Sequence, residues 1–369
     1  MKTAIFLGAG ASAAEGAPMQ SNLFKDYFES VRDQPLVDAP PNSPLRMKKE
    51  LSDFFEAMFS IRISRKGNLS KINFPTFEEA LGLLDLAEIR REGFKDYDLE
   101  VFGPDGNRIR IVRQFMVLAM AKAISDSLKK SKGVHRRLVR NLNQKRLLKD
   151  SLIISTNYDI LIDNAVSSMV PGRPGINLDY GVEFTNFVTR DWARPGIDAV
   201  RLYKLHGSLN WLYCAICNTV TLTPHVKGVI DLITDVATSR DRAICRVCGS
   251  IMTPIIIPPT FYKDMSRVFL SLIWNKAENA LRDVNHIIFC GYSFPDADLH
   301  LKYLIKRAQA NRRDPASLTF TVLNHHAGKT ARQVREERSR FYRFLGSKVV
   351  RYTNKSFEHF AETPADFYH

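Results

Sequence analysis

Short apolar runs recur along the chain, and most are bounded by glycine or polar residues. The runs with the length and β-branched content of buried strands are residues 3–8, 151–156, 199–205, 285–291, 318–324 and 348–353. Segments with helical spacing separate several of them, as at 22–31, 76–92 and 112–130. Thr76 and Glu79 predict a capping box at the start of the second of these helices. The alternation predicts an α/β fold with a doubly wound, Rossmann-like parallel sheet.

The spacing of the predicted strands is uneven, and this sets the expected domain organisation. A mostly helical stretch lies between the first two strands and predicts a helical insertion over residues 20–148. Paired cysteines mark a second region, 211–258, which predicts a small zinc-binding insertion. We therefore expect one α/β domain over residues 1–369 that carries two insertions.

A glycine loop, FLGAGASAAEG, follows the first predicted strand and opens a helix. Gly8 and Gly10 would let the backbone turn tightly and approach a pyrophosphate, and Ala13 stands where a third glycine is often found. The acidic residue that a dehydrogenase needs at the end of a second strand is missing, and no Gly-Lys-Ser/Thr follows the loop. The loop predicts dinucleotide binding but argues against an ordinary dehydrogenase or a P-loop. A plain strand–helix turn is the alternative.

The chain has five cysteines, and four of them form two Cys-x-x-Cys pairs. These are Cys214 with Cys217 and Cys245 with Cys248, a pattern that predicts a closed tetrahedral zinc site. A full set of four thiolates leaves no open coordination position, so this metal would be structural. A redox pair or a degenerate site without metal are the alternatives. Cys290 ends a strand-like run and is expected to be a buried core residue.

Polar residues follow four of the predicted strands at the point where each strand ends. They are Ser155 to Asp159 with Asn157 at the centre, His206 with Ser208, Gly291 with Ser293, Asp296 and Asp298, and Asn324. Ligands of open parallel sheets bind in the crevice beyond the carboxyl ends of the strands. These residues therefore predict a binding crevice, although Asp298 and Asn324 could equally be a helix cap or a turn residue.

Charge adds a preference for acidic partners. The 369 residues carry a formal net charge of +14, which favours nucleic acid, a nucleotide or an acidic protein. Basic residues concentrate at 129–149 and 329–343, both expected to be helices with solvated basic faces. Contact between these segments and DNA is a hypothesis without a supporting motif. No apolar run approaches the ~20 residues of a membrane span, so we expect a cytoplasmic protein with no membrane contact.

These motifs together resemble those of the sirtuin superfamily. Gly8 to Ser12 match its Gly-Ala-Gly-x-Ser loop, and Ser155 to Asp159 match its Thr-Gln-Asn-x-Asp with the glutamine replaced. His206-Gly207 precedes Cys214 as the family His-Gly precedes the first zinc knuckle. Gly291 to Ser293 and Asn324 match two later motifs. The segment GYSFPDAD and the large helical insertion look like the sirtuin-like NAD hydrolases of bacterial anti-phage defence, whereas the Asp-Phe-Arg and Phe-Gly-Glu segments of protein deacylases are replaced.

The resemblance implies cleavage of the nicotinamide–ribose bond of NAD+, with zinc in a structural role. It implies that His206 acts as general base, Asn157 positions water or the ribose hydroxyls, and Asp159 holds the nicotinamide amide. The residues implied to bind the rest of NAD+ are Gly8, Ala9, Gly10 and Ser12 at the phosphates, Gly291, Ser293 and Asn324 at the adenosine side, and Asp298.

Two other functions stay open at this point: an NAD-dependent protein lysine deacylase, and a nucleotide- or DNA-binding subunit of a larger defence complex. The resemblance also implies a homo-oligomer and allows a HerA-type DNA translocase as partner. Uncontrolled NAD+ cleavage would kill a cell, so we expect the activity to need a trigger.

Overall fold

A computed structural model gives the fold of the chain. It describes residues 2–37, 44–64, 66–99, 107–129, 131–169, 177–186, 192–222, 244–245, 247–250, 252–257, 268–296 and 298–368. Part of the predicted zinc-binding insertion, 223–243, lies outside these ranges.

A seven-stranded parallel sheet forms the centre of the molecule and confirms the predicted fold class. Its strands are β1 (Thr3–Leu7), β2 (Ser151–Ser155), β3 (Leu178–Asp179), β6 (Val200–Lys204), β10 (His286–Cys290), β11 (Thr319–Leu323) and β12 (Val350–Thr353). Six of these are the strands that the apolar runs predict. The seventh, β3, has only two residues and therefore no periodic signal in the sequence.

The strand order is β12-β11-β10-β1-β2-β6-β3. The chain winds outward from β1 through β2 to β6, then returns to the other side of β1 with β10, β11 and β12. This is the Rossmann strand order with β3 added at one edge, and its direction reverses between β1 and β10. A ligand crevice is therefore expected beyond the carboxyl ends of β1 and β10.

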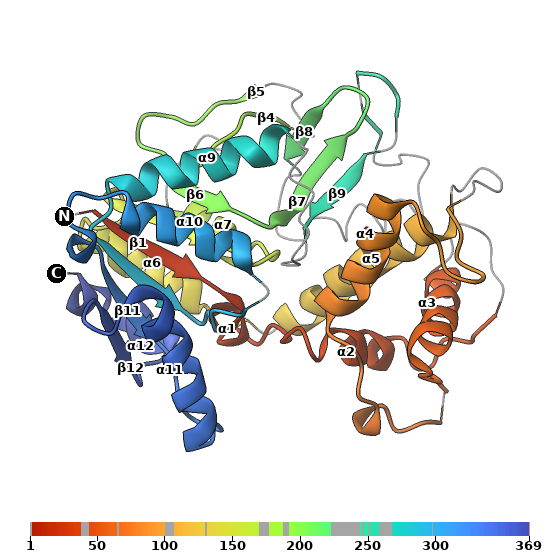
Figure 1. The fold of residues 1–369 in the computed structure, drawn as a ribbon. Coiled ribbons are helices and arrows are strands. Elements are labelled where there is room, and N and C mark those ends of the chain that lie inside the picture. Colours follow the sequence, from red (N-terminus) through yellow and green to blue (C-terminus); the bar gives the residue numbers. More distant parts are fainter. Residues whose placement is uncertain are drawn as a thin grey trace.

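Helices cover both faces of this sheet (Figure 1). They are α1 (Ala9–Ala13), α6 (Val134–Gln144), α7 (Leu161–Met169), α9 (Val268–Arg282), α10 (Leu299–Ala310), α11 (Ala331–Leu345) and α12 (Phe357–Glu362), with the short 3-10 turns η2 (Pro315–Ser317) and η3 (Pro364–Phe367). Helix α6 packs on α7 and α12, and α9 packs on α10. The predicted basic segments thus contain α6 and α11.

A second group of helices lies at the far end of the molecule from the two termini (Figure 1). It contains α2 (Leu23–Ser30), α3 (Pro44–Phe59), η1 (Leu69–Lys71), α4 (Phe77–Arg90) and α5 (Arg108–Leu128). Its core is aromatic: the rings of Phe24 and Phe55 lie 4.6 Å apart, with Phe28 and Phe77 buried beside them. The predicted capping box at the start of α4 is confirmed. Among the described elements of the predicted insertion 20–148, α6 packs with the sheet helices, while α2, α3 and α4 pack on α5.

A five-stranded second sheet stands beside the first, in the order β5-β4-β8-β7-β9. Its strands are β4 (Phe184–Asn186), β5 (Trp192–Ala193), β7 (Gly207–Cys214), β8 (Thr219–Leu222) and β9 (Thr253–Ile256). β7 pairs antiparallel with both β8 and β9. The sequence analysis did not predict this sheet, because most of its strands are too short to show alternation.

Among the residues that the structure describes, no helix combines the length and the apolar character that a bilayer crossing requires.

Candidate functional site

A cavity of about 590 Å³ lies beyond the carboxyl ends of the parallel strands, within the usual range for small-molecule sites of about 300–1,000 Å³. Segments far apart in the sequence meet there because their strands are neighbours in the sheet. The predicted residues that line it are Ala9, Gly10, Asn157, His206, Gly291, Ser293, Asp298 and Asn324. Gly8, Ser12 and Asp159 belong to the same loops but do not line it.

The glycine loop touches the segment after β10 backbone to backbone. Gly10 N donates to Gly291 O at 2.8 Å. A Cβ on Gly10 would stand 2.7 Å from the Gly291 Cα, and one on Gly291, whose φ is +61°, would stand 2.2 Å from the Ala11 nitrogen. Only glycine at both positions allows this approach. The predicted phosphate loop is thus fixed to its neighbour strand at the reversal point of the sheet.

Asn157 connects the segment after β2 to the glycine loop. Its Nδ2 donates to Gly8 O and to Ser12 Oγ, both at 2.9 Å. Ser12 Oγ in turn donates to Asp159 Oδ2 at 2.6 Å, and Asp159 Oδ1 accepts from the Leu161 amide. The asparagine therefore faces the cavity in a fixed orientation. Asp159 accepts from Ser12 and does not line the cavity.

His206 lines the cavity although its side chain is only 3% exposed. Its Nε2 lies 3.7 Å from Asp298 Oδ1, and the Asp298 side chain is 1% exposed. Tyr292 donates its hydroxyl proton to Asp298 Oδ2 at 3.0 Å. Burial, followed by the negative charge of Asp298, raises the pKa of Tyr292 well above its usual range, so this hydroxyl stays a donor. The sequence analysis placed Asp298 with the cofactor ligands and did not predict its place beside the histidine.

The other end of the cavity is polar and carries charges of both signs. Asn324 donates from Nδ2 to Glu337 and to Tyr352, and its Oδ1 accepts from Lys329 Nζ at 2.6 Å. Lys329 also forms an ion pair with Glu337 at 2.7 Å. Burial alone would raise the pKa of Glu337, but the hydrogen bonds from Lys329 and Asn324 outweigh it and lower that pKa. Glu337 and Lys329 were not predicted, because they lie on or before α11 with no motif to mark them.

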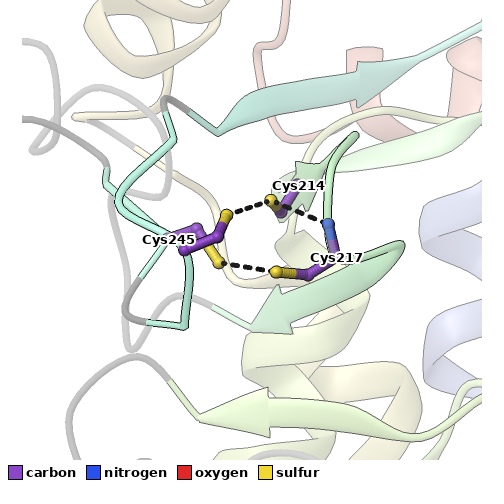
Figure 2. Close-up of side chains that lie close together, drawn as sticks. Cys214, Cys217 and Cys245 are labelled. Atoms are coloured by element: carbon purple, nitrogen blue, oxygen red, sulfur yellow. Dashed lines mark hydrogen bonds between the residues drawn. The ribbon is translucent and has the colours of Figure 1, made fainter.

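The four paired cysteines come together at the end of β7 (Figure 2). Their sulfur atoms all lie within 4.8 Å of one another. Cys214 and Cys248 are separated by 3.5 Å between sulfur atoms, and Cys217 and Cys245 by 3.9 Å, both far beyond the ~2.05 Å of a disulfide bond. Ligands around zinc at about 2.3 Å in a tetrahedron stand about 3.8 Å apart. The donor set and its spacing therefore fit a structural zinc ion.

β7 explains why a cavity histidine and a cysteine pair stand so close in the sequence. The strand starts directly after His206 at the cavity and ends at Cys214 in the cysteine cluster. Leu118 of α5 packs against this cluster together with Leu212 and Met252. The cysteine module thus lies between the second sheet and the helical group, one strand length from the cavity.

Comparisons with known proteins define the class of protein. A family model described as "SIR2-like domain" matches residues 151–345, which is more than half of the chain. Solved structures of Sir2 proteins align with it over nearly the whole length at low identity. The structure described as "The Structural basis of Sirtuin Substrate Affinity" is 14% identical, with 100% of this chain and 94% of that chain covered and a TM-score of 0.43. "Structure of Sir2Tm bound to a propionylated peptide" is 14% identical, with 99% and 92% covered and a TM-score of 0.41. No curated protein matches the chain.

The Rossmann-like sheet with a cavity at its reversal point makes this a doubly wound α/β protein. The match over residues 151–345 makes the assignment specific: the chain belongs to the SIR2-like domain family. The expected membership of the sirtuin superfamily is thereby confirmed. Its place within that superfamily, and its reaction, belong to the proposal that follows.

Proposed function

We propose that this protein hydrolyses NAD+ at the nicotinamide–ribose bond, giving nicotinamide and ADP-ribose. The observation that carries the proposal is the single cavity that joins the glycine loop, Asn157, His206 and Asn324. Ala9 and Gly10 of the glycine loop line the cavity and suit the pyrophosphate, and the polar end around Asn324 suits the adenosine ribose. His206 and Asn157 would then stand at the nicotinamide ribose.

The reaction needs little more than orientation and one base. The bond between the ribose and nicotinamide breaks through an oxocarbenium-like transition state, and nicotinamide leaves as a neutral molecule without a proton. A water molecule adds to the ribose carbon and loses one proton to His206, whose imidazole suits that role near neutral pH. Asn157 is fixed by Gly8 and Ser12 and would hold the water or a ribose hydroxyl.

The surroundings of His206 favour water over a lysine side chain as the acceptor. Tyr158 lies 6.4 Å from the His206 ring, between centroids, and Phe77 of the helical group lies 6.3 Å from Tyr158. The Tyr158 hydroxyl donates to Ile257 O at 2.9 Å and so closes this side of the histidine with the end of β9. A small molecule can reach a histidine that is 3% exposed, whereas a peptide-borne lysine needs an open channel to it.

The proposal is tested with purified protein and NAD+, following nicotinamide release by chromatography. His206→Ala and Asn157→Ala should each reduce the rate by about 10²- to 10⁴-fold, the usual contribution of a positioned base. Asn311→Ala, at the exposed end of α10, is the matched control and should keep the wild-type rate. Release that depends on an acetylated peptide would instead establish a deacylase. No release, with or without that peptide, would favour a binding subunit.

We further propose that the hydrolase is held inactive until triggered, as a means of NAD+ depletion in anti-phage defence. The support is the sequence resemblance and the toxicity of unrestrained NAD+ cleavage. We propose three kinds of partner: further copies of the same chain in a homo-oligomer, a HerA-type DNA translocase, and DNA. The same assay, run with DNA and with lysate from infected cells, tests this: activity that rises only with an addition supports it, and high activity of the purified protein alone contradicts it.

A further inference from the structure

The proposed reaction assigns no role to the carboxylate of Asp298, which lies beside His206 in the cavity. Asp298 Oδ1 and His206 Nε2 are 3.7 Å apart, within ion-pair distance but longer than a hydrogen bond. Contacts of this kind are often long in the absence of substrate and shorten when it binds. Both side chains are almost completely buried, at 1% and 3% exposure, so water screens their interaction very little.

Asp298 is held in this position from two directions. Tyr292 donates to its Oδ2 at 3.0 Å, which leaves Oδ1 as the oxygen nearer to the histidine. Asp298 also stands at the N-cap position of α10, a helix of 12 residues, but its side chain does not cap the helix amides. An N-cap aspartate ordinarily accepts such a bond, and this one faces His206 instead. The positive end of the helix dipole favours its negative charge.

We propose that Asp298 is a positioning residue for His206. It would fix the orientation of the imidazole and stabilise the imidazolium that forms when His206 takes a proton from water. This inference rests on the proposed hydrolysis. Asp298 would act as the aspartate does in a Ser-His-Asp triad, which holds the histidine and stabilises its charged form without taking the proton itself.

Other titratable groups also surround His206. Tyr158 packs beside its ring, with the centroids 6.4 Å apart, and Tyr292 donates to Asp298; burial raises the pKa of both hydroxyls well above the usual range, so both stay neutral. Glu78 of α4 is an acidic group that lines the same cavity. Arg113 and Asp85, whose charges act on Tyr158, form an ion pair with each other at 2.6 Å. Asp298 is distinguished by its position within ion-pair distance of the histidine.

The decisive variant is Asp298→Asn, compared with Asp198→Asn in the full-length protein. Asp198 is a matched control because it does not line the cavity, and its carboxylate is 76% exposed and paired with Lys149 at 2.8 Å. The pH dependence of kcat for nicotinamide release is measured for all three proteins. The activity is lost at low pH, where His206 is protonated and cannot act as base; this loss is the acid limb of the pH profile. The Asp298 carboxylate stabilises the imidazolium and so raises the pH at which the loss occurs. Asp298→Asn should shift this acid limb to lower pH and reduce the maximal kcat by about 10- to 100-fold, with KM changed less than threefold.

Asp198→Asn should leave both the limb and kcat at the wild-type values. Equal behaviour of the two variants would overturn the inference, and so would a loss that appears only in KM. Because Asp298→Asn could also fail to fold, its thermal melt is recorded beside the assay, and Tyr292→Phe is measured as a second variant. The phenylalanine keeps the ring but removes one donor to Asp298, and it should shift the same limb in the same direction by a smaller amount.

A measurement without turnover separates this inference from the proposed function. NMR titration of labelled histidines follows His206 in wild type, assigned by its absence from His206→Ala. The titration of His206 should move to lower pH in Asp298→Asn and stay unchanged in Asp198→Asn. This result would support the pairing even if wild type released no nicotinamide, which would refute the hydrolase only. An unchanged titration in Asp298→Asn would overturn the pairing whatever the activity.

Discussion

Ser12 shows how one small hydroxyl can fix the geometry of a site that it does not line. It accepts a hydrogen bond from Asn157 and donates one to Asp159, so two loops that follow different strands depend on it. All three side chains are buried. The orientation of the Asn157 amide toward the cavity therefore depends on a residue that does not line it.

Ser12→Ala should release Asn157 from one partner and leave Asp159 Oδ2 without its donor. An unsatisfied buried group of this kind costs about 1–3 kcal/mol, so the free energy of unfolding should fall by that amount in urea titrations. Nicotinamide release should fall by at least tenfold. Ser317→Ala, which loses only an exposed bond to Asp314 O, is the control and should change neither quantity.

At the scale of elements, the joint between α1 and α6 depends on one buried carboxylate. Glu15, just after α1, accepts from Ser131 Oγ at 2.6 Å and from the backbone amides of Gly133 and His135, both at 2.8 Å. Its Oε1 also lies 3.1 Å from His135 Nδ1. These donors stand at the start of α6, where negative charge is favoured. Glu15 thus connects the glycine-loop helix to the helix that covers the sheet.

This carboxylate should make stability depend on acid. Burial alone would raise the pKa of Glu15, but the hydrogen bonds from His135 and Ser131 outweigh it and lower the pKa from 4.5 to about 2. Its contribution, on the order of 3 kcal/mol, is therefore fully present above about pH 4.5 and is lost as pH falls toward 2.

Glu15→Gln should lower the free energy of unfolding at neutral pH, and its difference from wild type should shrink as the pH is lowered through this window. Urea titrations between pH 7 and the lowest pH at which wild type still folds measure that difference. Glu56→Gln serves as the control, because Glu56 is exposed and paired only with Arg62. A difference that stayed constant with pH would contradict the role given to Glu15.

The cysteine end of the second sheet has only a small apolar core of its own, whereas Trp211, Val220 and Leu222 of the same sheet pack into the main core. The buried side chains around the cluster are few: Leu212, Cys214, Cys245 and Met252. A bound zinc ion would therefore supply much of the local stability, because metal binding to a site that exists only in the folded chain is itself folding free energy.

Cys214→Ser should abolish stoichiometric zinc and lower the melting temperature, and a chelator should have the same effect on wild type. Metal content by mass spectrometry and a thermal melt measure the two effects. Cys290→Ala, in the core of the parallel sheet, removes a thiol without touching the cluster and should keep its zinc. Equal zinc in wild type and Cys214→Ser would show that the cluster does not bind the metal.

For the whole molecule, the parallel sheet was predictable because its strands are buried on both faces. Residues 4–7 and 287–290 are continuously apolar, and the polar residues after such runs fall at one edge in any parallel arrangement. Eight of the predicted site residues line one cavity for this reason. The cysteine pairs were equally plain, since their spacing alone indicates a metal site.

What the sequence could not provide are the contacts that depend on side-chain direction. Nothing local marks Glu337 as a partner of Asn324, because the two lie on different elements and meet only after β11 and α11 have packed. Asp298 carries the signal of a helix cap, and only the fold shows that its side chain faces His206. The second sheet is hidden for a different reason: strands of two to four residues have no period.

Ile257, just after β9, connects the second sheet to the cavity through two hydrogen bonds. Its amide donates to the carbonyl of His206 at 2.9 Å, and its own carbonyl accepts from the Tyr158 hydroxyl at 2.9 Å. β9 runs antiparallel to β7 from Thr253 opposite Tyr213, at the cysteine end, to Ile256 opposite Gly207, at the cavity end. The strand that starts at the cysteine module is therefore bonded at its other end to the histidine and to the ring beside it. We expect occupancy of the metal site and ligand binding in the cavity to be linked. Because linkage is reciprocal in binding free energy, NAD+ should tighten zinc binding by the same free energy with which zinc tightens NAD+ binding.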